Sequence, residues 1–381
     1  MNRIEELRKE IDTIDSGIVD LYRRRMDVAH SIGQYKREHG IPVSDPGRER
    51  ALLNRLGEAA GPEYEYGVRA LFNLLLSQSR ASQLLDQRPV SPLGESIRGA
   101  LRDTPPLFPP KAVVACQGLE GAYSQIACEK LFSAPSIMYF RQFDHVFDAV
   151  DSGLCRYGIL PIENSLAGSV SSVYDSMRRH RFFIVRSVRV KIDHTLLALP
   201  GAAMEDIREV YSHQQAIMQC SRFLADHPSW QVHVCENTAM AARTVAESGR
   251  KDIAAISSVA CAALYGLNCV ARDIQNNPNN HTRFICIARQ PEIYPGADHT
   301  SLMLSLPDKP GSLYELLGRF SAQGINLTRL ESRPIPGQDF EFMFYFEFES
   351  SVYSPQFTRL MEELSATLEQ FSYLGSYSEI V

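Results

Sequence analysis

Apolar residues in the first 85 positions recur every three or four residues, and no strand pattern interrupts them. The first run predicts one long helix with an apolar seam, ended by Gly40 and Pro42. Asp45 followed by Pro46 is typical of a helix N-cap with proline at the first helical position. We therefore expect a second helix from there and a third over roughly residues 65–85. The seam of the first helix comprises Ile4, Leu7, Ile11, Ile14, Ile18, Leu21, Arg25, Val28, Ile32 and Tyr35.

The middle of the chain alternates short apolar runs with helical patterns, which indicates an α/β arrangement with a largely covered sheet. Helices are expected over residues 124–132 and 215–224. The predicted strands cover residues 112–116, 157–162, 182–190, 230–235 and 283–288.

The last 80 or so residues predict the order strand, helix, strand, strand, helix, strand, which is the ferredoxin-like split unit. Six prolines between residues 86 and 110 argue against a continuous helix or central strand, so we interpret this segment as a linker. A second break lies at residues 289–298. The expected division is therefore 1–88, a Pro-rich linker at 89–110, then 111–290 and 298–381.

Composition is that of a globular chain of several domains, with 381 residues, 44% hydrophobic residues and a formal net charge of −6. No basic block could follow a phosphate backbone, so we expect no nucleic-acid partner. No apolar run approaches a membrane span, and the charged N-terminus does not resemble a signal peptide. The eight cysteines are scattered without a C-x-x-C motif, which favours reduced thiols in a cytoplasmic protein over a zinc cluster or disulfides.

Arg25 occupies a position of the first seam where leucine or isoleucine would be expected. A buried guanidinium without a partner is costly, so this position predicts an anionic partner. The alternatives to a ligand are an intramolecular carboxylate and a helix long enough to reach solvent. Lys36 returns to within about 20° of Arg25 around the helix. Ser79 and Gln83 continue an apolar stripe of the third helix with i, i+4 spacing, which favours a lined pocket. The start of the second helix adds Asp45, Arg48 and Glu49.

Arg8 lies 17 residues before Arg25, about 25 Å along a helix axis. One small ligand cannot contact both side chains of the same helix at that distance. If Arg8 is functional, it must reach a pocket formed with a partner helix, and the apolar seam predicts a helical dimer in any case.

The motifs LRKEIDTIDSGIVDLYRRR, GQYK, DPGRERALL and SQSRASQ resemble the all-helical chorismate mutase family across the whole N-terminal part. The resemblance implies an intertwined dimer in which each pocket takes one arginine from the other subunit. The rearrangement of chorismate to prephenate needs no nucleophile and no cofactor, only positioning and charge stabilisation. By resemblance, Arg8, Arg25 and Arg48 bind the substrate carboxylates, Lys36 and Gln83 the ether oxygen, Asp45 and Glu49 the hydroxyl end, and Ser79 supports binding.

Several loops in the middle part are rich in small and polar residues. The glycines of the GLEG turn at 118–121 precede a helix, where N–H groups could receive an anion, although most such loops are plain turns. Ser212 and Gln219 are seven residues apart, so we expect them on one helical face. His213 and His281 are possible acid–base groups, but exposed loop histidines are common.

The motifs GLEGAYS, GILPIENS, YSHQQAIMQC and NHTRFICIA occur in the order and spacing of the prephenate dehydratase family, over about residues 111–290. The resemblance implies two α/β lobes facing a cleft. Gln214 stands where the family usually has proline, which leaves the rigidity of that turn open. The site residues implied by the resemblance are Asn164, Ser212, Gln219, Thr282 and Arg283.

Side chains that are only weakly acidic suffice to catalyse this reaction, because aromatisation of the ring drives the loss of carbon dioxide and of the ring hydroxyl. We interpret Thr282 as a hydrogen-bond donor to the departing oxygen rather than as a full proton source. Arg283 is expected either to bind a substrate carboxylate or to hold its loop in place.

The stretch KPGSLYELLGRFSAQGINLTRLESRP resembles the ACT regulatory domain, which pairs across a dimer and binds phenylalanine. The usual Gly-Ala-Leu-Val is Gly-Ser-Leu-Tyr at 311–314, so the ligand fit could differ. A purely structural dimerisation module is the alternative. The residues assigned by resemblance are Gly311, Leu313, Asn326, Glu331, Ser332, Arg333 and Pro334.

Taken together, these resemblances imply an all-α mutase domain, a two-lobed α/β dehydratase domain and an α+β ferredoxin-like ACT domain. We expect a bifunctional enzyme of phenylalanine biosynthesis that converts chorismate to prephenate and prephenate to phenylpyruvate, inhibited by phenylalanine. It would act as a homodimer or higher homo-oligomer without cofactor or metal. The alternatives are an arogenate dehydratase activity in the middle domain and a non-catalytic small-molecule sensor.

Overall fold

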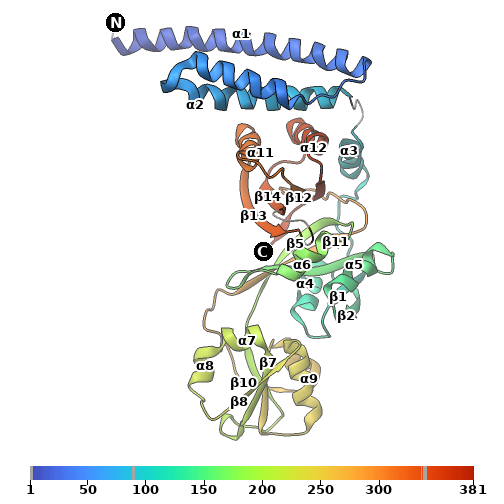
Figure 1. Cartoon of the computed structure of the whole chain (residues 1–381). Helices are drawn as coiled ribbons and strands as arrows, with labels where there is room; N and C mark the ends of the chain where they lie inside the picture. Colours follow the sequence, from blue (N-terminus) through green and yellow to red (C-terminus); the bar gives the residue numbers. More distant parts are fainter. Residues whose placement is uncertain (1–2, 88–90, 336, 338–340) are drawn as a thin grey trace. The chain divides into compact units, whose positions relative to one another are not determined.

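The computed structural model describes residues 3–87, 91–335, 337 and 341–381 (Figure 1), so the expected boundary at residues 88 and 89 lies outside the described residues. The chain divides into two compact units. The first comprises Met1–Gly99, Leu302–Phe346 and Val352–Tyr373. The second comprises Ala100–Ser301, Glu347–Ser351 and Leu374–Val381.

Two long helices, α1 (Arg3–Glu38) and α2 (Pro46–Gln87), form the N-terminal part and pack against each other. Gly61 interrupts α2 with φ 74° and ψ 165°, a backbone conformation that glycine adopts at little cost, and proline follows it. The kink therefore separates the predicted second and third helices. All three predicted helices are confirmed, with two of them joined at this corner.

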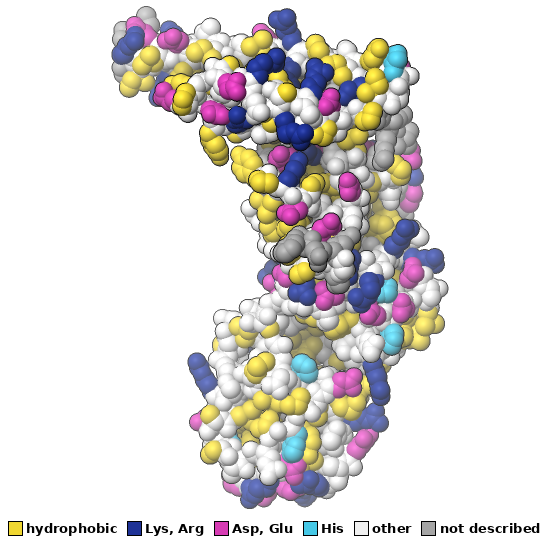
Figure 2. Space-filling view, viewed as in Figure 1, with side chains coloured by type: hydrophobic (Ala, Val, Ile, Leu, Met, Phe, Trp, Pro, Cys, Tyr) yellow, Lys and Arg dark blue, Asp and Glu magenta, His cyan; other side chains and the backbone are white. Residues whose placement is uncertain are grey.

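The apolar seam predicted for α1 is exposed in the single chain, as the hydrophobic side chains along the helical part show (Figure 2). Ile11 is 56% exposed, Ile18 54% and Leu21 64%. These residues do not serve the core of one chain. Within the described residues, no helix is both long enough and apolar enough to cross a membrane.

Helix α3 (Pro92–Asp103) lies within the segment 89–110, which was expected to be a Pro-rich linker. The prolines of this segment cluster at its two ends, and the residues between Pro92 and Pro105 contain none. Pro92 is the first residue of the helix, where its missing N–H would have no partner anyway. Ile97 anchors this helix and is fully buried.

The first lobe of the middle part is a sheet with the order β16-β5-β11-β3-β1-β2, and β4 pairs with β3. Strand β1 is parallel to β2 and β3, whereas β11 is antiparallel to its neighbours β3 and β5. The strands are β1 (Val113–Gln117), β2 (Ser136–Phe140), β3 (Tyr157–Asn164), β4 (Gly168–Ser169), β5 (Phe183–Lys191), β11 (His281–Ala288) and β16 (Glu379–Ile380), with helices α4 (Tyr123–Leu131), α5 (Phe143–Asp151) and α6 (Ser171–Met177).

The second lobe is a five-stranded sheet with the order β10-β6-β9-β7-β8 and its own apolar core. Where one helix was predicted at 215–224, the structure has two short helices, which are separated at Cys220. The elements are β6 (Thr195–Ala198), η1 (Met204–Asp206), β7 (Glu209–His213), α7 (Gln214–Gln219), α8 (Ser221–Ala225), β8 (Gln231–Cys235), α9 (Thr238–Ser248), β9 (Ile253–Ser257), α10 (Ala260–Tyr265) and β10 (Asn268–Ala271).

The C-terminal part has the predicted order of elements, and its sheet has the order β13-β14-β12-β15, with β13 at an edge. The final strand β16 was not predicted, and it adds to the sheet of the first lobe instead. The elements are β12 (His299–Ser305), α11 (Ser312–Ala322), β13 (Asn326–Pro334), β14 (Phe342–Glu349), α12 (Pro355–Thr367) and β15 (Phe371–Tyr377).

Candidate active sites

An open cavity of about 500 Å³ lies between α1, α2 and the loop that joins them. Seven of the eight residues predicted for the mutase site line it, namely Arg25, Lys36, Asp45, Arg48, Glu49, Ser79 and Gln83. The eighth, Arg8, is exposed on α1 and does not line the cavity. This separation agrees with the helical rise between Arg8 and Arg25.

Arg25 is held by neutral groups. Its Nη1 donates hydrogen bonds to the Leu75 carbonyl oxygen (3.0 Å) and to Ser79 Oγ (2.7 Å), and burial lowers its pKa. None of the ion pairs found in the described part of the chain includes Arg25. The alternative of an intramolecular carboxylate therefore finds no support, and the guanidinium keeps its charge available for an anionic ligand.

Other cavity groups are pre-positioned by the backbone. Lys36 Nζ donates to the Val43 carbonyl oxygen at 2.7 Å, and Asp45 Oδ1 accepts the Arg48 N–H at 3.0 Å as a helix N-cap. Gln83 is only 7% exposed, yet its Oε1 has no hydrogen-bond partner among the described residues. A buried amide without a partner favours a bound ligand at this position.

The charge of the cavity is strongly positive, with five cationic and two acidic side chains on its lining. Arg24 and Arg80 are additions that the sequence analysis missed, although each directly precedes or follows a predicted site residue. Arg80 forms a 2.5 Å ion pair with Glu49, so that carboxylate is partly neutralised. The lining suits a small molecule with two negative charges.

A second cavity, of about 360 Å³, lies between the two lobes of the middle part. Asn164 and Thr282 reach it from the first lobe, and Gln219 reaches it from the second. Two predicted site residues, Ser212 and Arg283, are not part of its lining. The cavity therefore brings together three of the five residues predicted for the dehydratase site.

Four side chains form a hydrogen-bond chain through this cavity. Asn164 Nδ2 donates to Thr282 Oγ1 at 3.0 Å, and Asn164 Oδ1 accepts the N–H groups of Leu166 and Ala167, which fixes the orientation of the amide. Gln219 Nε2 lies 3.5 Å from Asn164 Oδ1, and Gln219 Oε1 lies 2.8 Å from His194 Nε2. If the proton of His194 is on Nε2, the three hydrogen bonds run in one direction: His194 donates to Gln219, Gln219 donates to Asn164, and Asn164 donates to Thr282.

His194 was missed by the sequence analysis. It lies where the chain crosses from β5 to β6, is 2% exposed, and its Nδ1 has no partner among the described residues. Burial lowers its pKa, only partly opposed by the hydrogen bond to Gln219, so the neutral ring is favoured. The available signal was the polar pair Asp193-His194 between two apolar runs.

The expectation that Ser212 shares a helical face with Gln219 was wrong. Ser212 belongs to strand β7, is fully buried, and donates to the Ile256 carbonyl oxygen at 2.7 Å. The helix begins only after His213, whose side chain accepts the Gln215 N–H as an N-cap. Gln214 takes the first helical position, so the turn forms without the proline usual in the family.

The GLEG turn uses its own amides. Gly118 N donates to the Phe140 carbonyl oxygen at 2.8 Å, and Gly121 N donates to Gln125 Oε1 at 2.7 Å. These bonds favour a plain turn over an anion site. The two glycines have φ 105° and 88°, which other residues rarely adopt.

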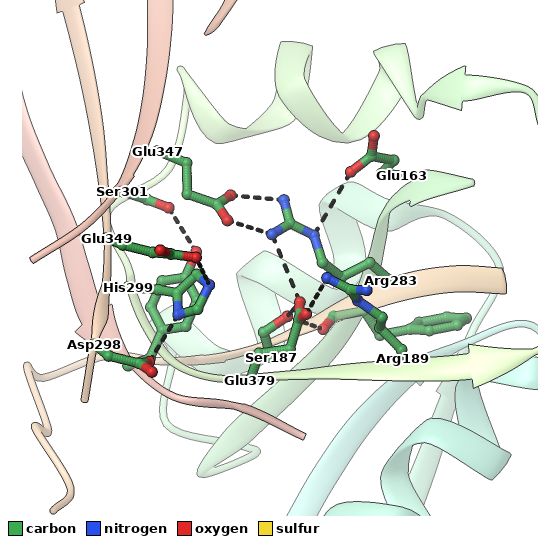
Figure 3. Close-up of polar contacts among 12 residues, drawn as sticks. Glu163, Ser187, Arg189, Arg283, Asp298, His299, Ser301, Glu347, Glu349 and Glu379 are labelled. Atoms are coloured by element: carbon green, nitrogen blue, oxygen red, sulfur yellow. Dashed lines mark hydrogen bonds and ion pairs between the residues drawn. The ribbon is translucent and has the colours of Figure 1, made fainter. Parts of the chain in front are cut away.

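Arg283 does not line the cavity, and it forms a bidentate ion pair with Glu347 of β14 (Figure 3). Of the two roles expected for it, this contact favours holding the strand over binding a substrate carboxylate.

The residues assigned to the regulatory ligand lie on two neighbouring elements. Gly311 precedes α11 with φ 90° and open space around its Cα, and Leu313 lies in the first turn of that helix. Asn326 begins the edge strand β13, and along that strand Ser332 and Pro334 are exposed while Glu331 and Arg333 are half-buried on the other face.

Three family models match the chain in the order expected. Chorismate mutase type II matches residues 7–84, prephenate dehydratase residues 114–292, and the ACT domain residues 300–352. Among solved structures, the prephenate dehydratase from Arthrobacter aurescens in complex with L-Phe has a TM-score of 0.64 and 29% identity, covering 70% of this chain and 89% of that one.

Two kinds of curated relative are similar to the chain. "Arogenate dehydratase 2" of Petunia hybrida is 40% identical over 69% of this chain and 71% of its own length. The "Bifunctional chorismate mutase/prephenate dehydratase" of Escherichia coli K12 is 31% identical over 99% of this chain and 96% of its own length. Because that match includes both cavities and the C-terminal part, the chain belongs to the family of bifunctional chorismate mutase/prephenate dehydratases.

Proposed function

We propose that the chain catalyses two consecutive steps, chorismate to prephenate in the helical cavity and prephenate to phenylpyruvate in the cavity between the lobes. The observation that carries this proposal is the presence of two separate cavities, the first lined by seven of the eight residues expected for the mutase site and the second by three of the five expected for the dehydratase site. The product of the first reaction is the substrate of the second.

In the mutase cavity, binding and positioning account for the chemistry. Arg25 and Arg48 bind the substrate carboxylates, and Arg8 of a second copy completes the site, because Arg8 of the same chain lies outside it. The apolar seam left exposed on α1 supplies the surface for that second copy. Lys36 and the unpartnered amide of Gln83 stabilise the charge that develops on the ether oxygen as it leaves.

In the dehydratase cavity, Thr282 acts as a hydrogen-bond donor. Its oxygen accepts a hydrogen bond from the Asn164 amide, and it donates no hydrogen bond within the described residues, so its O–H is available to donate a hydrogen bond to the departing hydroxyl of prephenate. The bond to the carboxylate breaks, its electron pair enters the ring, and carbon dioxide and the hydroxyl group leave. The chain from His194 through Gln219 to Asn164 keeps Thr282 in the donor orientation.

The C-terminal part is the regulatory domain, and phenylalanine is its ligand. The resemblance to a dehydratase solved with L-Phe supports this assignment. Gly311 leaves the backbone accessible, Asn326 offers polar contacts, and the edge strand β13 can pair with a second copy in a homodimer or larger assembly.

We propose that the chain divides into the parts 1–88, 111–290 and 298–381, with the segment 89–110 joining the first two. We place the protein in the cytoplasm, where its eight unpaired cysteines would remain reduced.

Arogenate is the competing substrate of the second site, since the Petunia hybrida relative that bears this name matches 69% of this chain. Prephenate is favoured because the same chain carries the cavity that produces it. Purified protein supplied with prephenate and arogenate separately tests this preference. Higher kcat/KM on prephenate supports the proposal, and higher kcat/KM on arogenate overturns it.

A further inference from the structure

Thr282 lies beside an irregularity in the sheet. In the pairing of β11 with β3, Arg283 lies opposite Glu163 and Phe284 lies opposite Pro161, so Ile162 of β3 is the extra residue of a bulge. On its other side, β11 pairs with β5 without a break from His281 to Cys286. The ladder with β3 is therefore interrupted directly behind Thr282, and contacts made by the neighbouring Arg283 add to those that hold this end of β11.

Arg283 supplies such a contact on the opposite face of the strand, because successive side chains of a strand alternate. Its guanidinium meets Glu347 of β14 in a bidentate ion pair, with Nη2 2.6 Å from Oε2. The two side chains are 11% and 6% exposed. Figure 3 shows the guanidinium between this carboxylate and those of two other glutamates, Glu163 and Glu379.

The two most buried of these carboxylates come from segments that follow the dehydratase match in the sequence. Glu347 lies in the C-terminal sheet and Glu379 in the terminal strand β16, both beyond the residues 114–292 that match the dehydratase family. Glu379 is also held by Arg189 of β5 at 2.5 Å. Burial alone would lower the pKa of Arg283, but the hydrogen bond to Glu347 and the nearby carboxylates keep it above its ordinary value. The arginine stays charged and fixed.

We propose that Glu347 is a positioning residue for the dehydratase reaction, which acts by fixing Arg283 and thereby the end of β11 that places Thr282, opposite the bulge in β3. This inference rests on the proposed dehydratase function. Arg283 then acts through the strand and does not touch the substrate. A misplacement of about 1 Å at a reacting group can lower a rate about 100-fold, so the contact has a measurable effect on turnover.

The first test compares Glu347→Gln with Glu349→Gln in the full-length chain. Glu349 lies two residues later in the same strand, and its side chain is 58% exposed. We expect Glu347→Gln to lower the dehydratase kcat about 10- to 100-fold with little change in KM, and to leave mutase activity unchanged. The proposal is overturned if Glu347→Gln keeps a kcat within about twofold of the Glu349→Gln control.

The second test separates positioning from substrate binding and from misfolding. Replacing a buried ion pair by apolar residues is often tolerated, whereas removing one partner leaves a buried charge unpaired. The double variant Arg283→Met/Glu347→Leu should therefore recover kcat relative to either single variant, with a KM close to that of the unchanged protein. A double variant as slow as Arg283→Met with a raised KM would show that Arg283 binds substrate, which contradicts the proposal.

The unchanged protein is assayed first with prephenate and arogenate. Failure to turn over both overturns the proposed function and, with it, this inference. Normal turnover that is insensitive to Glu347→Gln overturns the positioning role alone.

Discussion

Asn164 Nδ2 donates a 3.0 Å hydrogen bond to Thr282 Oγ1, and this contact joins the two strands that meet at the cavity between the lobes. The bond occupies a lone pair of the threonine oxygen and leaves its proton for a ligand. Because Thr282 accepts in this hydrogen bond, its own O–H remains available to donate a hydrogen bond to a ligand.

Asn164→Asp tests the direction of this hydrogen bond, because a carboxylate of the same shape accepts a hydrogen bond and cannot give one to Thr282. The loop N–H groups of Leu166 and Ala167 keep their acceptor, so the fold is preserved. We expect the dehydratase kcat to fall about 100-fold or more, as for loss of a donor in a preorganised site, while mutase activity stays normal. An unchanged dehydratase kcat would mean that Thr282 is not oriented by Asn164.

His194 predicts a dependence of stability on pH. Its folded pKa is lowered by burial, so the unfolded chain binds a proton that the folded chain does not. The contribution of His194 to the free energy of unfolding therefore falls as the pH decreases below about 6.5, the ordinary histidine pKa, and is fully present above it. Burial lowers the pKa of His213 as well, so that residue adds to the same slope.

The only tryptophan of the chain, Trp230, lies in the core of the second lobe, and its fluorescence reports the unfolding of that lobe. Urea midpoints measured in this way between about pH 5 and pH 8 should fall less steeply in His194→Gln than in the unchanged protein. Equal slopes would show that His194 is not held neutral.

Gly33 and Gln83 predict a sharp steric effect on the mutase site. A Cβ at Gly33 would lie 2.7 Å from Gln83 Cγ and 3.4 Å from its Cα, so α1 and the end of α2 would have to separate. Gly33→Ala should lower mutase kcat/KM at least about 10-fold and leave dehydratase activity unchanged, although alanine itself favours a helix by about 0.5–1 kcal/mol.

Gly67→Ala in α2 is the matched control, since nothing lies within 4 Å of a Cβ there. The steric account fails if Gly33→Ala and Gly67→Ala have the same mutase activity.

Gly311 predicts a change in the response to phenylalanine. Its φ of 90° lies in the left-handed region, so alanine there costs about 1–2 kcal/mol and shifts the loop before α11. We expect the Gly311→Ala variant to need at least about fivefold more phenylalanine for half-inhibition of the dehydratase. That change corresponds to a loss of about 1 kcal/mol in the coupling free energy between phenylalanine binding and the dehydratase site. Gly318→Ala, inside α11 with open space, should respond like the unchanged protein. Identical inhibition curves for Gly311→Ala and Gly318→Ala would remove Gly311 from the ligand loop.

Features that depend on residues close together in the sequence, such as helix positions and caps, were predicted from local sequence patterns. The spacing of apolar residues located α1, and Asp45-Pro46 located the start of α2 with its N-cap bond. A cation in an apolar seam pointed to Arg25, and the structure brings Ser79 to it from the far end of α2. The order of elements in the C-terminal part also followed from periodicity and turn residues.

Contacts between distant segments could not be predicted in this way. No pattern around Arg283 indicates its pairing with Glu347, because 64 residues separate them. The strand β16 is only two residues long, too short for a periodic signal. Ser212 was misplaced because the boundary between β7 and α7 depends on the His213 cap, and an i, i+7 spacing carries no meaning across such a boundary.

The central claim is that one chain holds two independent active sites, and the variants Lys36→Ala and Thr282→Ala test it most directly. Both are prepared as full-length proteins, and each is assayed with chorismate for mutase activity and with prephenate for dehydratase activity. The account predicts that Lys36→Ala loses mutase and keeps dehydratase turnover, while Thr282→Ala loses dehydratase and keeps mutase turnover. Near-normal activity of either variant at its own site, or parallel loss of both activities in each, would contradict it.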